Sequence, residues 1–107
     1  MTPTLGNLEL AALLAVVRLA DEAYGQAIRQ DLGARAGRDY SVGAIYTTLQ
    51  RLETKGLLTS RASEPLPVRG GRSRRLFSVT GAGARAIRDA QQQAVAMWAG
   101  LGSPRRA

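Results

Sequence analysis

The segment of residues 41–56 constrains the fold of this 107-residue chain more than any other. Apolar side chains recur along it with the spacing of one α-helical face, at Val42, Ile45, Leu49 and Leu52. Ser41 precedes this run and has the side chain of an N-cap, and Gly56 follows it as a C-terminal stop. The segment therefore predicts an amphipathic helix with clear start and stop signals.

The opposite face of this predicted helix carries small, hydroxyl, amide and guanidinium groups and no acid: Gly43, Tyr46, Thr47, Gln50, Arg51 and Thr54. Groups of these kinds contact the phosphates and base edges of nucleic acids. On this segment alone, an ordinary amphipathic helix with a solvated polar face is an equal alternative.

The net charge of +7 is concentrated in the second half of the chain. Residues 1–64 contain seven basic and seven acidic side chains, whereas residues 65–107 contain eight arginines and a single acid, Asp89. Such an asymmetry indicates a polyanionic partner, with nucleic acid first and an anionic membrane second.

The composition argues against catalysis. The chain contains no His and no Cys, so it lacks the commonest general base, the commonest metal ligand and any thiolate. We therefore expect no enzyme, no cofactor and no metal site. Neither an apolar run of membrane-spanning length nor an export signal is present, so a cytoplasmic protein is expected.

Two further helices are predicted before the central segment. The first starts near residues 4–7 and runs to about Leu19, and apolar residues occupy nearly all its sides, which requires cover from more than one direction. That cover is either a second subunit or the rest of the same domain. The second helix, about residues 23–34 and ended by Gly33 and Gly37, precedes the central segment by a short loop, as in a helix-turn-helix.

After Gly56 the apolar period changes from helical to alternating. Residues 57–61 and 75–79 are predicted strands, joined by a loop with two prolines, and together they form a hairpin, or wing, that must lean on the helices. The wing contains the densest cluster of positive charge: Arg69, Gly70, Gly71, Arg72, Arg74 and Arg75. Glycines allow an anion to approach the backbone, and the guanidinium groups bind phosphate. A basic loop that only favours solubility is the alternative.

A last helix is predicted from Gly81 to about Gly100, with Thr80 as its cap. Small and apolar residues alternate along it in steps of four and three, which is typical of a coiled-coil seam. Gly83 belongs to this seam as a small residue that permits close helix contact. Dimerisation is favoured over packing on the chain's own domain. The residues expected at the dimer interface are Leu10, Leu14, Val17, Ile87, Ala90, Ala94, Met97, Trp98 and Leu101.

Several short motifs in order resemble the PadR family of transcriptional regulators. They are Leu5-Gly6 with Glu9, Ala23-Tyr24-Gly25 with Ile28, Ser41-Val42-Gly43-Ala44-Ile45-Tyr46 with Leu49, Arg51-Leu52-Glu53 with Lys55-Gly56-Leu57, Gly70-Gly71-Arg72, and Leu76-Phe77-Ser78-Val79-Thr80 with Gly83. No single motif is specific, but the ordered set covers about residues 5–87 in register. The chain departs from the family pattern in its long, proline-containing wing loop and its short last helix.

The resemblance implies a mainly α winged helix-turn-helix with a two-stranded β wing and an added C-terminal dimerisation helix. It implies a homodimeric repressor that binds an inverted-repeat operator in double-stranded DNA. Residues 1–80 would form the DNA-binding domain and residues 81–107 the dimerisation helix and tail. The residues expected at the DNA, from the resemblance and from the residue chemistry together, are Tyr24, Ser41, Gly43, Ala44, Tyr46, Thr47, Gln50, Arg51, Arg69, Gly70, Gly71, Arg72 and Arg74.

Some small members of the family bind planar aromatic drugs between tryptophans at the dimer interface. This chain has one tryptophan, Trp98, about one turn further along than the family position. An interface anchor is therefore favoured over a ligand contact for Trp98. The competing functions are a winged-helix protein-interaction module and an RNA-binding winged helix, neither of which needs an operator.

Overall fold

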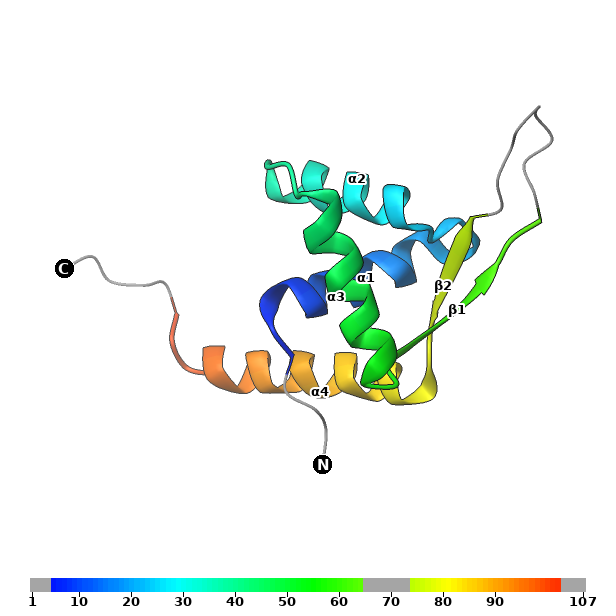
Figure 1. Cartoon of the computed structure of the whole chain (residues 1–107). Helices are drawn as coiled ribbons and strands as arrows, with labels where there is room; N and C mark the ends of the chain where they lie inside the picture. Colours follow the sequence, from blue (N-terminus) through cyan, green and yellow to red (C-terminus); the bar gives the residue numbers. More distant parts are fainter. Residues whose placement is uncertain (1–4, 65–73, 103–107) are drawn as a thin grey trace.

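The computed structural model describes residues 5–64 and 74–102, which form four helices and a two-stranded antiparallel sheet (Figure 1). The fold is therefore mainly helical with a β wing, as the sequence predicts. In chain order the elements are α1 (Asn7–Leu19), a 3-10 turn (Ala20–Glu22), α2 (Gly25–Ala36), α3 (Val42–Thr54), β1 (Leu58–Ala62), β2 (Arg75–Val79) and α4 (Gly81–Trp98).

Helix α1 is the centre of the domain and contacts α2, α3, α4 and β2. Its residues Ala12, Leu13 and Val16 are buried in the core. Two of its apolar residues are left uncovered by the described residues, since Leu14 is 36% exposed and Val17 is 56% exposed. The alternative of a helix wrapped entirely by its own domain therefore fails at Leu14 and Val17.

Helix α2 starts and ends two residues later than predicted. Tyr24 is not helical because its backbone forms an isolated bridge with Leu76 of β2. At the other end the helix continues through Gly33, and Gly37, with a φ of 67°, terminates it. Glycine tolerates this left-handed conformation without the steric cost that a Cβ would impose.

Helix α3 has the predicted caps and most of the predicted core face. The Ser41 hydroxyl accepts a hydrogen bond from the Ala44 N–H at 3.0 Å, which satisfies one of the unpaired donors of the first turn. Val42 is a correction, because it is 50% exposed rather than buried. It lies in the first turn, before the part of α3 that packs on the other helices. Thr48 joins the buried face instead, and its hydroxyl donates to the Ala44 carbonyl at 2.7 Å.

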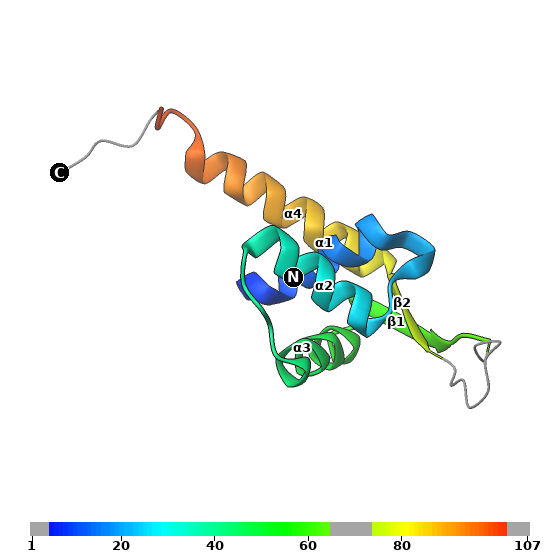
Figure 2. The same ribbon diagram turned by 90° about the horizontal axis from the view of Figure 1, so that it is seen from above.

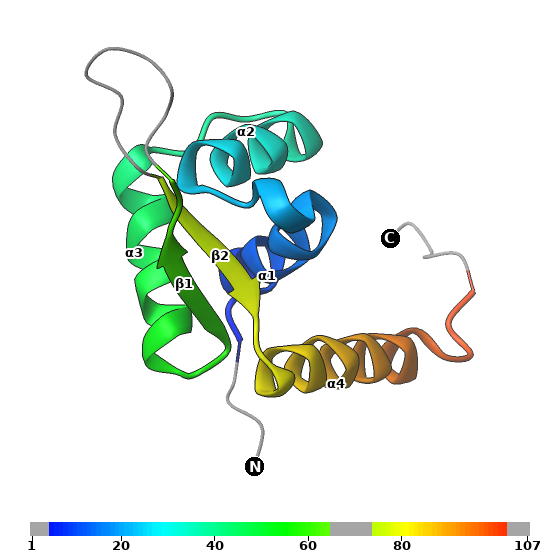
Figure 3. The same cartoon turned by 90° about the vertical axis from the view of Figure 1, so that its right-hand side faces the viewer.

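The wing is tied to the helices along β2. Strand β1 begins one residue later than predicted, at Leu58, which pairs with Val79. Phe77 is buried, and its N–H donates to the Ala23 carbonyl at 2.8 Å. Figure 3 shows α3 and the two strands side by side, away from the free end of α4. The orientation of the wing is thus fixed by the segment that leads into α2.

Among the described residues, α4 is buried against the domain only in its first half. Thr80 caps it, accepting the Gly83 N–H at 3.0 Å and donating to the Gly56 carbonyl at 2.7 Å. Gly83 is not a seam residue, because a Cβ there would overlap the Leu57 carbonyl oxygen and lie 2.8 Å from Cγ1 of Val79. From Gln91 onward every described residue is exposed, and Figure 2 shows this part extending away from the other helices.

Candidate nucleic-acid interface

The polar face of α3 is exposed along its length. Gly43, Tyr46, Thr47, Gln50, Arg51 and Thr54 are all exposed, and no acid lies among them. A shallow cleft of about 360 Å³ runs along the second half of this face, lined by Thr47, Gln50, Arg51, Thr54 and Lys55. Ala44 differs from the others, because it is half-buried and its N–H is already bonded to Ser41.

Arg51 keeps its guanidinium available on this face. The neighbouring acid Glu53 accepts a hydrogen bond from the Ser60 hydroxyl at 3.0 Å rather than pairing with Arg51. Within residues 5–64 and 74–102, Arg51 forms no salt bridge. A pair between Arg51 and Glu53 or another neighbouring acid is therefore absent from the described part of the chain.

The end of α3 is fixed by an ion pair that the sequence did not indicate. Lys55 Nζ lies 2.7 Å from Oε2 of Glu9, and the other carboxylate oxygen of Glu9 accepts the Gly6 N–H at 2.8 Å. The Lys55 hydrogen bond, together with that of Gly6, lowers the pKa of the Glu9 carboxyl below its ordinary value of 4.5. Because 46 residues separate the partners, no local pattern could reveal the pair.

Tyr46 crosses from α3 onto the first turn of α2. A Cβ placed on Gly25 would lie 2.5 Å from Cζ of Tyr46, so the ring occupies the space above that glycine. Tyr46 remains about half exposed, which leaves part of the ring accessible from outside. Gly25 is not among the site residues predicted from the sequence. Its lack of a side chain is needed for Tyr46, a predicted DNA contact, to occupy this position.

Arg74 lies at the base of the wing against the same two helices. Its guanidinium carbon lies 4.1 Å from the centroid of the Tyr24 ring, a cation–π distance. A cavity of about 420 Å³ lies between the wing base and the start of α2, lined by Tyr24, Gly25, Gln26, Tyr46, Arg74 and Arg75. Three predicted DNA contacts, from three separate segments, thus meet at one place.

The remaining predicted wing contacts, Arg69, Gly70, Gly71 and Arg72, lie outside the described residues. Arg75, which was not assigned to the site, belongs to the same strand end as Arg74. Its Nη1 donates to the Ser60 hydroxyl at 3.0 Å, so this arginine is held within the sheet.

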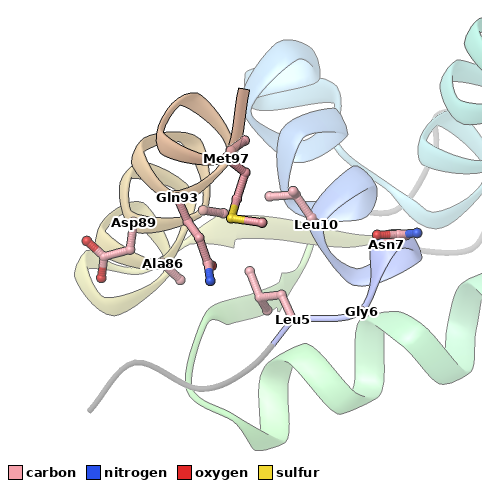
Figure 4. Close-up of a pocket in the computed structure, with 10 residues that line it drawn as sticks. Leu5, Gly6, Asn7, Leu10, Ala86, Asp89, Gln93 and Met97 are labelled. Atoms are coloured by element: carbon pink, nitrogen blue, oxygen red, sulfur yellow. The ribbon is translucent and has the colours of Figure 1, made fainter. Parts of the chain in front are cut away.

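A second surface lies on α1 and α4. Of the predicted interface residues, Leu10, Ile87 and Ala90 are half-buried, and Leu14, Val17, Ala94, Met97, Trp98 and Leu101 are exposed. Leu101 lies beyond the helix, which ends at Trp98 rather than near Gly100. Val95 is exposed as well and was not predicted. Figure 4 shows a cavity of about 560 Å³ between the start of α1 and α4, where Leu10 and Met97 extend toward one another.

The model of the transcriptional regulator PadR-like family matches residues 13–89. The chain belongs to this family. The match spans the helix-turn-helix, the wing and the first half of α4. PadR-like regulators are DNA-binding transcription factors, generally without enzymatic activity, and this chain is accordingly a DNA-binding transcriptional regulator.

Solved structures of other regulators have the same fold. A Streptococcus transcriptional regulator is 31% identical with a TM-score of 0.67, covering 84% of this chain and 83% of its own. A PadR family regulator from Eggerthella lenta is 29% identical with a TM-score of 0.65, covering 89% and 84%. A PadR-like transcription factor from Bacteroides fragilis is 25% identical with a TM-score of 0.70, covering 84% and 82%. No functionally curated protein matches the sequence.

The described part of this PadR-like chain contains no helix that is both long enough and apolar enough to cross a bilayer.

Proposed function

We propose that this PadR-like regulator is a homodimeric repressor that binds an inverted-repeat operator. Residues 1–80 form the DNA-binding domain, and residues 81–107 form the dimerisation helix and tail. The observation that carries the proposal is the exposed face of α3 formed by Gly43, Tyr46, Thr47, Gln50, Arg51 and Thr54, on which Arg51 forms no salt bridge within the described residues. A surface of that composition suits the major groove, where phosphates surround the base edges.

In this proposal α3 enters the major groove with its N-terminal end nearest the backbone. Ser41 and Gly43 lie at that end, where the unpaired N–H groups of the first turn attract a phosphate. Gln50 and Arg51 lie further along, with side chains that suit adenine and guanine respectively. The wing arginines add phosphate or minor-groove contacts.

The dimer part of the proposal rests on uncovered apolar side chains. Val17 is 56% exposed, Met97 76% and Trp98 68% in the single chain. Exposed apolar patches of this kind mark interaction surfaces in soluble proteins. A twofold pair of chains joined there presents two copies of α3 to successive major grooves of a palindromic site.

A salt-titrated gel shift tests the DNA-binding proposal. Full-length protein is titrated against its own upstream region, scrambled duplex and structured RNA at several salt concentrations. We expect the upstream duplex to bind most tightly, and footprinting to protect an inverted repeat. Equal affinity for all three nucleic acids would refute an operator, and preference for RNA would favour the RNA-binding alternative.

One variant on α3, with a control outside α3, separates base contacts from phosphate contacts. Gln50→Ala is expected to lower discrimination between operator and scrambled DNA by roughly 1–3 kcal/mol, with little change in nonspecific affinity. Gln30→Ala, which removes an exposed glutamine on α2, is the matched control and should change neither quantity. If Gln50→Ala weakens both duplexes equally, Gln50 does not contact a base specifically.

The effector part of the proposal concerns a small planar aromatic compound. Trp98 is its fluorescent reporter, although Trp98 does not line the cavity between α1 and α4 in the single chain. We expect such a compound to quench Trp98 emission and to release the operator over the same concentration range. Quenching without release would refute effector control.

A further inference from the structure

The Tyr24–Arg74 stack leaves the hydrogen-bonding edge of the arginine unused. A guanidinium group carries its five N–H donors in its own plane, whereas a ring beneath it contacts only its face. Within residues 5–64 and 74–102, no acceptor for the Arg74 side chain is found. Arg74 is exposed, so a partner from outside can reach that edge.

Both members of the stack are fixed by their backbones. Arg74 and Ser63 are joined by two hydrogen bonds, from the Arg74 N–H to Ser63 Oγ at 2.8 Å and from the Ser63 N–H to the Arg74 carbonyl at 2.6 Å. Tyr24 is held by its bridge to Leu76 and as the N-cap residue of α2. The ring and the guanidinium are therefore brought together by the wing and the helix-turn-helix, not by chance contact of two free side chains.

The two neighbouring arginines of the wing base have different environments. Arg75 donates a hydrogen bond to Ser60, whose hydroxyl in turn donates to Glu53. The Arg75 side chain is therefore already bonded within the protein. The Arg74 guanidinium stacks on the ring of Tyr24 and has no hydrogen-bond acceptor among the described residues. Both line the cavity of about 420 Å³ that also receives Tyr46 from α3. Of the two, Arg74 is the one whose donors are available to a phosphodiester.

We propose that Tyr24 is a positioning residue that acts through Arg74. Its ring holds the guanidinium so that the free N–H edge binds a DNA phosphate at the cavity between wing base, α2 and α3. The inference rests on the proposed DNA binding and adds that the Tyr24 ring face matters while its hydroxyl does not. Sequence-independent affinity, rather than base discrimination, is the property that this pair controls.

A double-mutant cycle on DNA affinity tests the pair. Tyr24→Leu removes the ring and is expected to weaken binding to all duplexes by about two- to fivefold per protomer, the equivalent of a partly exposed cation–π contact. Tyr24→Phe retains the ring and should bind like the wild type. In the Arg74→Ala background, Tyr24→Leu should cause no further loss, because the ring then has nothing to position.

The slope of log affinity against log salt distinguishes positioning from a merely structural role. Loss of one phosphate contact flattens this slope by about 0.9 per protomer, so Tyr24→Leu should move it toward the value of Arg74→Ala. Tyr40→Leu is the matched control, since Tyr40 also stacks with an arginine, Arg38 at 4.8 Å, and should leave the slope unchanged. Urea midpoints of all variants exclude unfolding as the cause.

Two results would overturn the inference. If Tyr24→Phe loses as much affinity as Tyr24→Leu, the hydroxyl contacts DNA directly. If the effects of Tyr24→Leu and Arg74→Ala add, the two residues act independently. Absence of salt-dependent DNA binding in the wild type would instead refute the proposed function itself, so the two failures are distinguishable.

Discussion

Replacing Gly83 with alanine tests the packing of α4 on the domain. A Cβ at this position would overlap the Leu57 carbonyl oxygen and would lie 3.1 Å from the Leu57 carbonyl carbon and 2.8 Å from Cγ1 of Val79. Two of these three neighbours are backbone atoms. The Leu57 carbonyl also accepts the Thr80 N–H at 3.1 Å, so it cannot turn away without breaking the junction between wing and helix.

The expected loss of stability follows from two opposing effects. Overpacking typically costs about 1–3 kcal/mol, and the unyielding backbone places Gly83→Ala at the upper end of that range. Alanine is favoured over glycine inside a helix by about 1 kcal/mol. The net loss in the free energy of unfolding is therefore about 2 kcal/mol. In a domain of this size that loss lowers Tm by roughly 10 °C.

Urea unfolding followed by far-ultraviolet circular dichroism measures this loss. All variants are compared at one protomer concentration, because self-association would make the midpoint concentration-dependent. Gly81→Ala is the matched control, since its Cβ would meet only Nη1 of Arg85 at 3.7 Å, an ordinary contact. Free energies of unfolding within about 0.5 kcal/mol of each other for Gly83→Ala and Gly81→Ala would refute the packing argument.

Two further predictions concern charge and capping. Because the pKa of Glu9 is lowered by Lys55 in the folded chain, its contribution is complete above about pH 4.5 and is lost as pH falls through the lowered pKa. Glu9→Gln should therefore cost about 1 kcal/mol at pH 7, with a deficit that disappears toward pH 3 in urea titrations; a pH-independent deficit would contradict the linkage. Ser41→Ala should lower stability by about 1 kcal/mol through loss of the cap. Ser41→Asp should retain stability but weaken DNA binding in gel shifts, and unchanged affinity would remove Ser41 from the interface.

Local sequence signals predicted the elements whose formation is local. The apolar spacing and the caps of α3, and the residues of β2, agree with the structure because helix periodicity and capping depend on neighbours within one or two turns. The sequence predicts the start of α2 too early because a backbone bridge to Leu76, more than 50 residues away, keeps Tyr24 extended. Val42 is apolar like the residues of the core face, but it is 50% exposed because the helices that cover the rest of this face do not cover the first turn.

The residues of the candidate site could be predicted from the sequence, but the contacts that hold them in place could not. The polar face of α3 follows from composition and helix period, so its residues could be chosen from the sequence alone. The contacts that seat them join distant segments: Tyr46 over Gly25, Arg74 over Tyr24, and Lys55 with Glu9. Gly83 is a further example. The sequence predicts that this small residue permits contact with a second subunit, whereas in the structure the Leu57 carbonyl of the same chain packs against it.

The burial of α4 against the domain in its first half alone, among the described residues, has a consequence for how the sequence of α4 can change in evolution. Helix α2, α3 and the wing are fixed to one another by the Phe77–Ala23 hydrogen bond, the Tyr24–Leu76 bridge and the packing of β1 on α3. The second half of α4 contacts none of them strongly enough to bury a residue. In the proposed dimer, substitutions, insertions or deletions beyond Gln91 would change the distance between the two DNA-binding domains without altering how each domain contacts DNA. The spacing of the proposed inverted repeat and the sequence of each half-site could then change independently in evolution.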